Sequence, residues 1–392
     1  MKILIVCQFY YPENFVIYKI AETLKSFGHD VHVLTGKPNY GYGYILPEYK
    51  HVIDEEINGV KVHRVNLYPR KDSRISIIKN YLSFWKNSKK WVKKTKIKFD
   101  VVYSMSLSPV TILAAGNLYK KKYGVPHVCH CVDLWPESVL VTNAVKEGSL
   151  AYRILYHWSK KLYEGCDRIL VGSPSFKDYF VNKLKMSGEN IVYIPQPSLV
   201  DDSESIKPYS LGEGFNILYC GNLGRIQLVE MIPNAMKLVK NPDVRFHVIG
   251  MGPMTNEFLK RIADLKLANK VIYHGPLPAQ KAAPYFKSAD ALFVSLKSEG
   301  VAGKTIPNKL IMSMAFSKPI LGMLEGDGKD VLKKSGGAIF ADQNEQSLAE
   351  AIQAISTVSS LTLKKLGALN RAYYEDNFEL EKVVREIEKY LI

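Results

Sequence analysis

Long hydrophobic runs are missing from this chain of 392 residues. No apolar segment approaches the roughly 20 residues that a helix needs to cross a bilayer. Residues 1–15 include a short apolar run, but neither a cationic stretch nor a small-residue cleavage site precedes Pro12. We therefore expect a buried strand at this end instead of a signal peptide. No repeat or biased tract is present, and the length suffices for two globular domains.

Cysteine is scarce, and its positions do not predict disulfides. The five cysteines are odd in number, scattered and mostly placed in apolar segments: Cys7, Cys129, Cys131, Cys166 and Cys220. This pattern is typical of reduced thiols in a cytoplasmic protein. His130 lies between two of them, but alternation along a strand points it away from both sulfurs, so we predict no metal site.

Acidic residues are few where basic residues gather. The formal net charge is +15, and between Lys61 and Lys98 thirteen Lys and Arg accompany one acid, Asp72, a local charge of +12. Within residues 74–98 large apolar side chains are interspersed with the lysines: Ile75, Ile78, Leu82, Phe84, Trp85 and Trp91. A basic amphipathic helix of this kind suits an anionic membrane surface. We expect no nucleic-acid partner, because no motif for one is present. A helix packed on a sheet, with its lysines simply solvated, is the remaining interpretation.

Short apolar strands alternate with helix-length segments along the chain. Strands are expected at residues 2–6, 30–34, 100–104, 125–133, 168–172 and 191–194, and then at 216–220, 245–250, 271–274, 291–295, 319–322 and 337–340. Strands joined by helices form parallel βαβ units. The pattern therefore predicts an α/β protein with two doubly wound, Rossmann-like domains facing a central cleft, where strand ends bind ligands.

The domain boundaries follow from a polar, turn-rich stretch in the middle of the chain. We predict an N-terminal domain at residues 1–197, a linker at 198–214 and a C-terminal domain at 215–375. A C-terminal helix at 376–392 is predicted to cross back to the N-terminal domain.

Glycine turns follow strands of the C-terminal domain. Their glycines and the asparagine beside them are Gly221, Asn222, Gly224, Gly250 and Gly252. Such turns let backbone N–H groups approach an anion, and Arg225 adds a fixed charge behind the first turn. One such turn alone is equally well explained as a tight strand-to-helix connection.

Two more charged residues stand at expected element ends. Asp133 ends an apolar strand in HCVDLWPES, where a carboxylate suits sugar hydroxyls or a developing oxocarbenium ion. A helix-capping or turn aspartate is the alternative. Lys309 begins a helix in IPNKLIMSM, as an anion-binding or a merely solvated lysine.

The chain resembles the retaining glycosyltransferases of family four, which have the GT-B fold. In the second half the matching motifs are YCGNLG, FHVIGMGP, VIYHGPLP, SADALFVSL and IPNKLIMSMAFSKPIL. In the first half, MKILIVCQFYYPENF, VHVLTGKPNYGYG, HCVDLWPES and CDRILVGSPSF resemble the WbuB-like branch, which transfers deoxy-amino sugars such as N-acetyl-L-fucosamine during O-antigen assembly.

The resemblance implies a nucleotide-sugar donor, expected to be UDP-linked, and no metal cofactor. Arg225 and Lys309, with Lys304 as a third candidate, match the cations that meet the diphosphate, and Asp133 joins them as a catalytic candidate. The donor-binding candidates are Gly221, Asn222, Gly224, Gly250, Gly252, Leu277, Glu299, Asn308 and Glu325. The acceptor-binding candidates are Glu13, Asn14, Phe15, Asn39, Tyr40, Trp135 and Glu137.

The chain departs from the family pattern at several positions, among them Gln227, which stands where many relatives carry a lysine. Lys304 and Met312 occupy the places of the two glutamates in the common E-x7-E pair. A methionine cannot accept the hydrogen bonds of ribose hydroxyls. We therefore hypothesise that Glu299, Asn308, or the turn with Glu325 and Asp327 takes over this contact.

These features predict a cytoplasmic enzyme, peripheral to the inner face of the cell membrane, that extends a saccharide carried on polyprenyl diphosphate. The product would be an O-antigen or capsule polysaccharide. A non-hydrolysing nucleotide-sugar epimerase with the same fold is the alternative, and a non-catalytic nucleotide-sugar or lipid-binding module is a third possibility.

Overall fold

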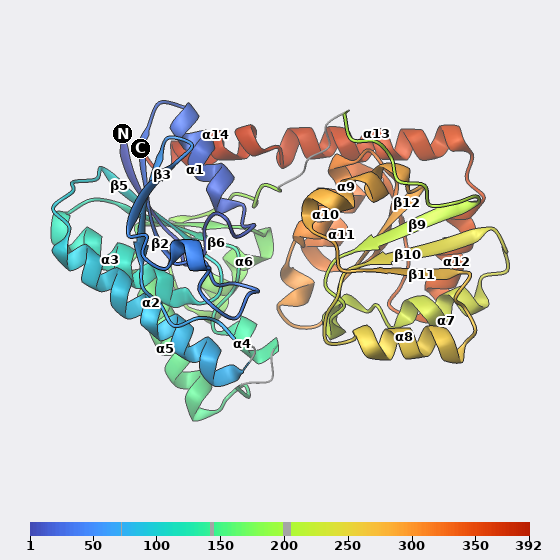
Figure 1. Cartoon of the computed structure of the whole chain (residues 1–392), viewed down its shortest axis with the longest axis horizontal. Helices are drawn as coiled ribbons and strands as arrows, with labels where there is room; N and C mark the ends of the chain where they lie inside the picture. Colours follow the sequence, from blue (N-terminus) through green and yellow to red (C-terminus); the bar gives the residue numbers. More distant parts are fainter. Residues whose placement is uncertain (72, 142–144, 199–204) are drawn as a thin grey trace. The chain divides into compact units, whose positions relative to one another are not determined.

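The structure, a computed structural model, describes residues 1–71, 73–141, 145–198 and 205–392. Asp72 and residues 199–204 of the expected linker lie outside the described residues. The chain divides into two compact units (Figure 1). Unit 1 comprises Met1–Pro197 together with Leu380–Ile392, and unit 2 comprises Ser198–Glu379.

Unit 1 is built on an eight-stranded sheet with the order β3-β4-β2-β1-β5-β6-β7-β8. Its strands are β1 (Lys2–Val6), β2 (Asp30–Gly36), β3 (Asp54–Ile57), β4 (Val60–Val65), β5 (Val101–Ser106), β6 (His127–Cys131), β7 (Arg168–Val171) and β8 (Ile191–Tyr193). All neighbouring pairs are parallel except β3 and β4, which form an antiparallel hairpin. The predicted parallel alternation is confirmed, but the hairpin was not predicted.

The helices of unit 1 include one that is contributed by the C-terminus. They are α1 (Ile17–Ser26), α2 (Arg74–Lys94), α3 (Leu113–Tyr123), α4 (Glu137–Val141), α5 (Leu150–Glu164), α6 (Pro174–Asp178) and α14 (Leu380–Lys389). α14 contacts α1, and it buries Val383, Val384 and Ile387. No described helix is long and apolar enough to cross a membrane.

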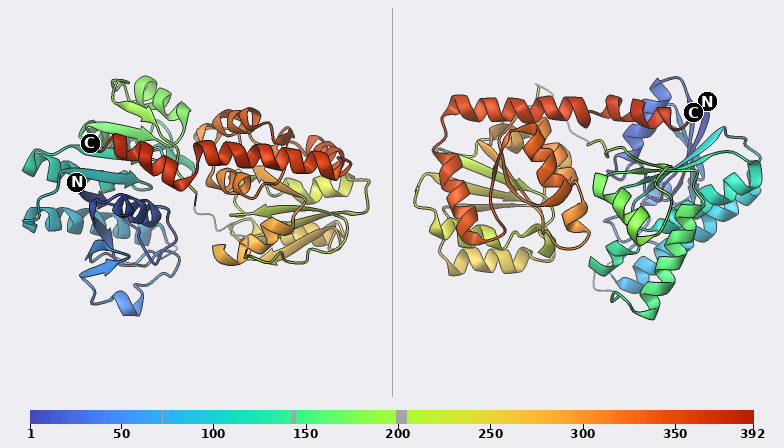
Figure 2. Two further views of the ribbon diagram at one scale, coloured as in Figure 1. Left: turned by 90° about the horizontal axis from the view of Figure 1, so that it is seen from above. Right: turned by 180° about the vertical axis from the view of Figure 1, so that it is seen from behind.

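Unit 2 is a six-stranded parallel sheet with the order β11-β10-β9-β12-β13-β14. Its strands are β9 (Phe215–Cys220), β10 (Val244–Ile249), β11 (Val271–Gly275), β12 (Ala291–Ser295), β13 (Ile320–Met323) and β14 (Ala338–Phe340). Its helices are α7 (Met231–Leu238), α8 (Thr255–Asp264), α9 (Ala279–Ser288), α10 (Asn308–Ala315), α11 (Gly326–Ser335), α12 (Glu345–Ser356) and α13 (Ser360–Asn377). Helices cover both faces of this sheet (Figure 2).

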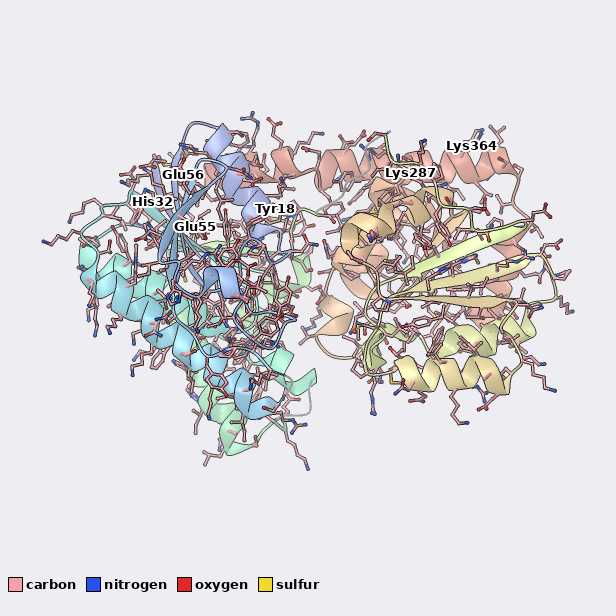
Figure 3. All side chains as sticks on the ribbon, in the orientation of Figure 1. Tyr18, His32, Glu55, Glu56, Lys287 and Lys364 are labelled. Carbon is pink, nitrogen blue, oxygen red and sulfur yellow. The ribbon has the colours of Figure 1, made fainter. Side chains whose placement is uncertain are left out.

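The central strands are buried on both faces, which explains their continuous apolar sequences. Ile3, Leu4 and Ile5 of β1 are inaccessible to solvent, as are Ile217 and Tyr219 of β9. β3 is different, because its acidic side chains alternate between exposed and half-buried positions. Figure 3 shows two of them, Glu55 and Glu56, at this edge of the sheet.

Candidate active site

Each sheet has one point where the chain reverses its direction of winding. In unit 2 this point lies between β9 and β12, and in unit 1 it lies between β1 and β5. In open α/β sheets, ligands bind outside the carboxyl ends of the strands at such a point. The segments that follow these strands are therefore the candidates for ligand binding.

In unit 2 the turns after β9 and β10 are packed backbone against backbone. A Cβ on Gly250 would lie 1.8 Å from the carbonyl oxygen of Gly221, and Gly250 has a φ of +134°. A Cβ on Gly252 would lie 2.4 Å from Oδ1 of Asn222. Tyr219 Oη donates a hydrogen bond of 2.6 Å to the carbonyl of Asn222. Glycine is thus required at these positions to bring the two turns together.

Lys309 lies in the first turn of α10, and its ammonium group has no hydrogen-bonding partner. Its Nζ is shielded from solvent and lies 4.9 Å from the centre of the Tyr219 ring. Its Cδ would lie 3.9 Å from a Cβ placed on Gly221, so the side chain runs beside the glycine turn. Burial lowers the pKa of Lys309 to about 7. The interpretation as a solvated lysine is therefore wrong, and an anion is the group that this amine lacks.

Arg225 and Lys304 supply further positive charge from nearby loops. Arg225 begins a short 3-10 helix, Arg225–Gln227, after the glycine turn, and its side chain is exposed. Lys304 is exposed at the end of another, Ala302–Lys304. Asn308 is the first residue of α10 and is also exposed. All are accessible to a ligand.

Two acceptor atoms near the glycine turn have no partner. They are Oε1 of Gln227 and Oε2 of Glu230, both of which are buried. Burial is the main cause that raises the pKa of Glu230. Sequence reasoning missed both as acceptors, and Glu230 carries no signal in the sequence beyond its place ten residues after a strand.

The residues proposed to replace the missing glutamate differ in their surroundings. Glu299 is exposed and pairs with Lys297 at 2.8 Å. Glu325 precedes α11 and pairs with Lys329 at 2.7 Å, and Asp327 is buried. Met312 is half-buried and packs against the apolar cluster under α10, as does Leu277.

In unit 1, Asp133 follows β6 and belongs to a hydrogen-bonded chain. Ser108 Oγ donates to its carboxylate at 3.1 Å, and Trp135 Nε1 donates to Ser108 Oγ at 2.9 Å. Burial raises the pKa of Asp133. Ser108 follows β5, so this chain of contacts reaches the reversal point of the sheet.

Two of the acceptor-binding candidates serve to build the loops. The Glu13 carboxylate accepts hydrogen bonds from the backbone N–H groups of Asn39 at 2.7 Å and Tyr40 at 2.6 Å. Glu137 is buried and accepts from the hydroxyls of Tyr152 at 2.7 Å and Tyr179 at 3.0 Å. We infer that both carboxylates position the loops and do not face a substrate.

The other candidates surround these loops. Asn39 is buried, and its Oδ1 accepts from Asn80 Nδ2 at 3.0 Å. The ring of Phe15 lies 5.1 Å from that of Tyr40, which is exposed, as is Asn14. Tyr40 and Asn14 are therefore the accessible members of this group.

Arg70 and Tyr81 were not predicted from the sequence. The Arg70 guanidinium donates to Tyr81 Oη at 2.7 Å and lies 5.3 Å from the centre of the Tyr40 ring. Both line an apolar cavity that also reaches Ser108 and Trp135. In the sequence, Arg70 is one of many cations in the basic segment, and nothing in the pattern distinguishes it from the others.

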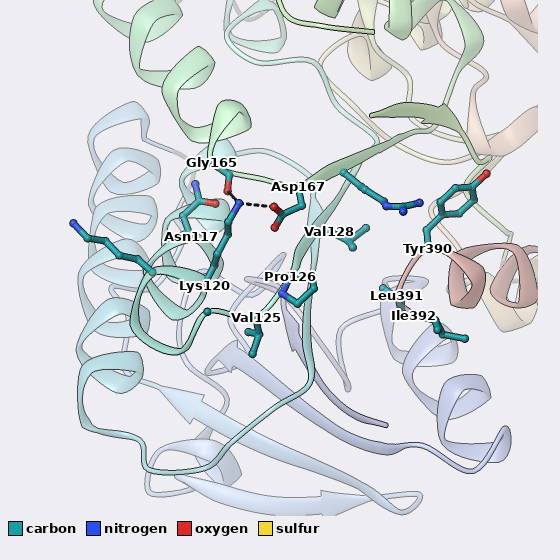
Figure 4. A pocket seen from close by; sticks show the side chains of 13 residues that line it. Asn117, Lys120, Val125, Pro126, Val128, Gly165, Asp167, Tyr390, Leu391 and Ile392 are labelled. Atoms are coloured by element: carbon teal, nitrogen blue, oxygen red, sulfur yellow. Dashed lines mark hydrogen bonds and ion pairs between the residues drawn. The ribbon is translucent and has the colours of Figure 1, made fainter. Parts of the chain in front are cut away.

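Unit 1 has another cavity, of about 710 Å³, on the side of the sheet opposite to the carboxyl ends of the strands (Figure 4). It is lined by residues at the amino ends of β6 and β7, where ligands of open α/β sheets do not usually bind. Its Lys120 is already held by Asp167 at 2.7 Å and by the carbonyl of Gly165 at 3.1 Å. Lys121 and Arg168 also line it, so its place at the amino ends of the strands, and not a lack of cations, distinguishes it from the site beside the glycine turn.

Two family models match the chain, one in each unit. Residues 14–197 match the "Glycosyl transferase 4-like domain", and residues 214–357 match "Glycosyl transferases group 1". Both models therefore describe enzymes that transfer sugars, and together they span most of the chain.

Curated relatives agree with these models. The chain is 27% identical to the "Probable glycosyltransferase WbjE" of Pseudomonas aeruginosa over an alignment of 290 residues, and this alignment covers 71% of each chain. It is 23% identical to the "Putative colanic acid biosynthesis glycosyl transferase WcaI" of Escherichia coli (strain K12), over an alignment that covers 98% of each chain. Among solved structures, Anabaena Alr3699/HepE in complex with UDP has a TM-score of 0.72 at 14% identity, over 100% of this chain and 99% of that one. The relationship in fold thus extends over both units.

Proposed function

Since the chain belongs to the glycosyltransferases, with family models matched in both units and the GT-B fold, we propose that it transfers a sugar from a UDP-sugar with retention of configuration. The sugar is a deoxy-amino sugar such as N-acetyl-L-fucosamine. The acceptor is a saccharide on polyprenyl diphosphate, and the product is a precursor of O-antigen or capsule polysaccharide. The resemblance to WcaI, whose name refers to colanic acid, supports a role in polysaccharide assembly.

The unpartnered ammonium of Lys309 is the observation that carries this proposal. When the bond between the anomeric carbon and the phosphate oxygen breaks, negative charge develops on the diphosphate. We propose that Lys309 and Arg225, together with the backbone N–H groups of the glycine turn, stabilise that charge. Cations in this arrangement make a metal ion unnecessary, so we propose a metal-independent reaction. UDP in the HepE complex supports the choice of the nucleotide.

Asp133 provides the corresponding group in unit 1. Its carboxylate is held by Ser108, and we propose that it interacts with a sugar hydroxyl or with the positive character that develops on the sugar ring. Tyr40 and Asn14 are accessible to the acceptor saccharide. The matched relatives are named glycosyltransferases, which favours sugar transfer over the epimerase alternative.

We further propose that α2 brings the enzyme to the inner face of the cell membrane. Its lysines are joined on the exposed surface by Ile75, Ile78 and Leu82. Phe84, in contrast, is buried in the core, and Trp91 packs on His63 with ring centres 4.9 Å apart. The interpretation of Phe84 as membrane-facing is therefore wrong, whereas Trp91 is only half-buried.

The test is transfer from a panel of UDP-sugars and GDP-sugars to lipid-linked acceptors, in buffer with a chelator. We expect transfer from a UDP-linked deoxy-amino sugar, and a loss of about 100-fold in kcat/KM for Lys309→Ala and for Arg225→Ala. Lys260→Ala is the control, because Lys260 is an exposed cation of unit 2 that pairs with Asp264. Absence of transfer from every donor, or unchanged rates in both variants, would contradict the proposal.

A further inference from the structure

Unit 1 contains an apolar cavity of about 530 Å³, lined in part by Ser108, the hydrogen-bonding partner of Asp133. It lies between α2 and α5, below the loops that follow β5 and β6. Its apolar lining comes from both helices and from α4: Ile77, Tyr81, Leu82, Val139, Leu155 and Trp158. This size falls within the roughly 300–1,000 Å³ that is typical of small-molecule sites. No role in donor or acceptor sugar binding accounts for an apolar space of this size.

The cavity reaches the protein surface along α2. Ile78 and Leu82 line it, yet 56% and 44% of their surfaces remain exposed. Ile75, one turn earlier on the same helix, is 67% exposed and does not line the cavity. Large aliphatic side chains that line a cavity and are also open to solvent indicate an apolar ligand that enters from outside.

The lining of the cavity also includes positively charged and polar residues. Arg70 and Arg74 line it, as does Ser108, whose hydroxyl holds Asp133. A ligand with an apolar chain in the cavity would therefore place an anionic head group by the arginines and a sugar by Asp133. An uncharged apolar ligand would bring no anion to the two arginines.

We propose that this cavity binds the first part of the prenyl chain of a prenyl diphosphate-linked acceptor, with the diphosphate at Arg70 and Arg74. The inference rests on the proposed function, because that function supplies the lipid-linked acceptor. It adds a defined binding site for the chain, distinct from general adhesion of α2 to a bilayer.

The test measures binding without donor or turnover. The full-length protein is titrated with farnesyl diphosphate and, separately, with inorganic diphosphate. Tryptophan fluorescence reports the binding, because Trp135 and Trp158 line the cavity. We expect farnesyl diphosphate to bind at least about tenfold more tightly than inorganic diphosphate, and Ile78→Gln to remove about this factor. Ile78 is exposed, so its replacement is expected to leave the melting temperature unchanged.

Ile75→Gln is the matched control, and it should bind farnesyl diphosphate as the wild type does. Equal affinity for farnesyl and inorganic diphosphate would overturn the proposal, as would wild-type affinity in both Ile78→Gln and Leu82→Gln. Equal weakening by Ile75→Gln and Ile78→Gln would also overturn it, because binding would then not depend on whether the residue lines the cavity. These measurements do not involve Lys309 or the donor, so their failure is distinguishable from failure of the proposed transfer.

Discussion

Lys309 lies in surroundings that disfavour the positive charge that a lysine side chain normally carries. Its ammonium has the Tyr219 ring as a neighbour but no carboxylate or carbonyl partner among the described residues. The sequence identified the position through its resemblance to a family motif. It could not show that Nζ is buried, because burial depends on how the turn after β9 packs against α10.

The pKa of Lys309 is about 7, against an ordinary value of 10.5, and this difference predicts that the free energy of unfolding depends on pH. Below pH 7 both the folded and the unfolded chain hold the proton, and the folded state carries the full penalty of a buried cation. As the pH rises from about 7 to 10.5, the unfolded chain holds more of the proton than the folded state does, so stability increases. Because each pKa unit corresponds to about 1.4 kcal/mol, Lys309→Met should stabilise the ligand-free protein by on the order of 4 kcal/mol at pH 7 and have almost no effect near pH 10.5.

Chemical denaturation of wild type and Lys309→Met at several pH values checks this. Lys260→Met is the control, since Lys260 is exposed, and it should show no comparable trend. In the wild type, UDP affinity should fall roughly tenfold from pH 7 to pH 8.5, because the anion requires the protonated amine. A stability difference that is independent of pH would show that Lys309 is already neutralised by another group.

Glu230 is the residue for which the structure suggests a role that the sequence did not. Its unpartnered, buried oxygen could accept a hydrogen bond from a donor hydroxyl, the task for which Met312 is unsuited. We expect Glu230→Gln to weaken UDP binding about tenfold and to leave the affinity for inorganic diphosphate unchanged. Calorimetric titration of both ligands checks this.

Glu299→Gln is the comparison, because Glu299 is exposed and pairs with Lys297. If Glu299→Gln weakened UDP binding and Glu230→Gln did not, the assignment of ribose recognition to Glu299 would be favoured.

At the scale of elements, the two glycine turns are sensitive to the addition of a single methyl group. Gly250→Ala would place Cβ 1.8 Å from the Gly221 carbonyl oxygen, so the two turns must separate. We expect a loss of about 3 kcal/mol or more in the free energy of unfolding, together with loss of UDP binding. Thermal or chemical denaturation measures the first effect and titration the second.

Gly275→Ala separates this clash from backbone strain. Gly275 also has a positive φ, +75°, but no atom lies within 4 Å of the place that an added methyl group would take. It should cost only about 1–2 kcal/mol, which is the strain of the left-handed conformation for an alanine. Equal losses in the two variants would mean that φ strain, and not the contact between the turns, determines stability here.

Strand prediction succeeded for the continuous apolar strands and failed at the hairpin of β3 and β4. β1 and β12 have the predicted bounds, because continuous apolar segments such as KILIV belong to buried parallel strands. β3 has the sequence DEEI, whose acids give no strand pattern. Its pairing depends on β4, where buried Arg64 forms an ion pair with Glu55. Such a cross-strand partner is not visible in the sequence of one strand.

The buried face of α2 could not be predicted from the composition of the helix. The residues that it buries include Ser76, Asn80 and Ser88, and it leaves Ile75 and Ile78 exposed. Asn80 is buried because Gln8 Nε2 donates to its Oδ1 at 2.6 Å. A polar residue on the buried face of a helix inverts the usual pattern, and only the partner on another element explains it.

At the scale of the whole molecule, the chain completes unit 1 with its last helix. After unit 2 ends at Glu379, α14 packs on α1, with Glu388 Oε1 2.7 Å from His29 Nε2 and Arg385 4.2 Å from the centre of the Phe27 ring. Val383, Val384 and Ile387 are buried there. The sequence showed the apolar spacing of this helix but not the surface on which it packs.

This packing predicts that a substitution near the C-terminus destabilises the N-terminal unit. Ile387 is fully buried, so Ile387→Ala should lower the stability of unit 1 by about 2–4 kcal/mol. Hydrogen exchange should then rise in peptides from α1 and β1 and remain unchanged in peptides from β9 and β10, since α14 belongs to unit 1. Ile392→Ala, at a residue that is mostly exposed, should leave both sets unchanged. If exchange rose in unit 2 and not in α1, the stability of the two units would be coupled in a way that the contacts of α14 do not explain.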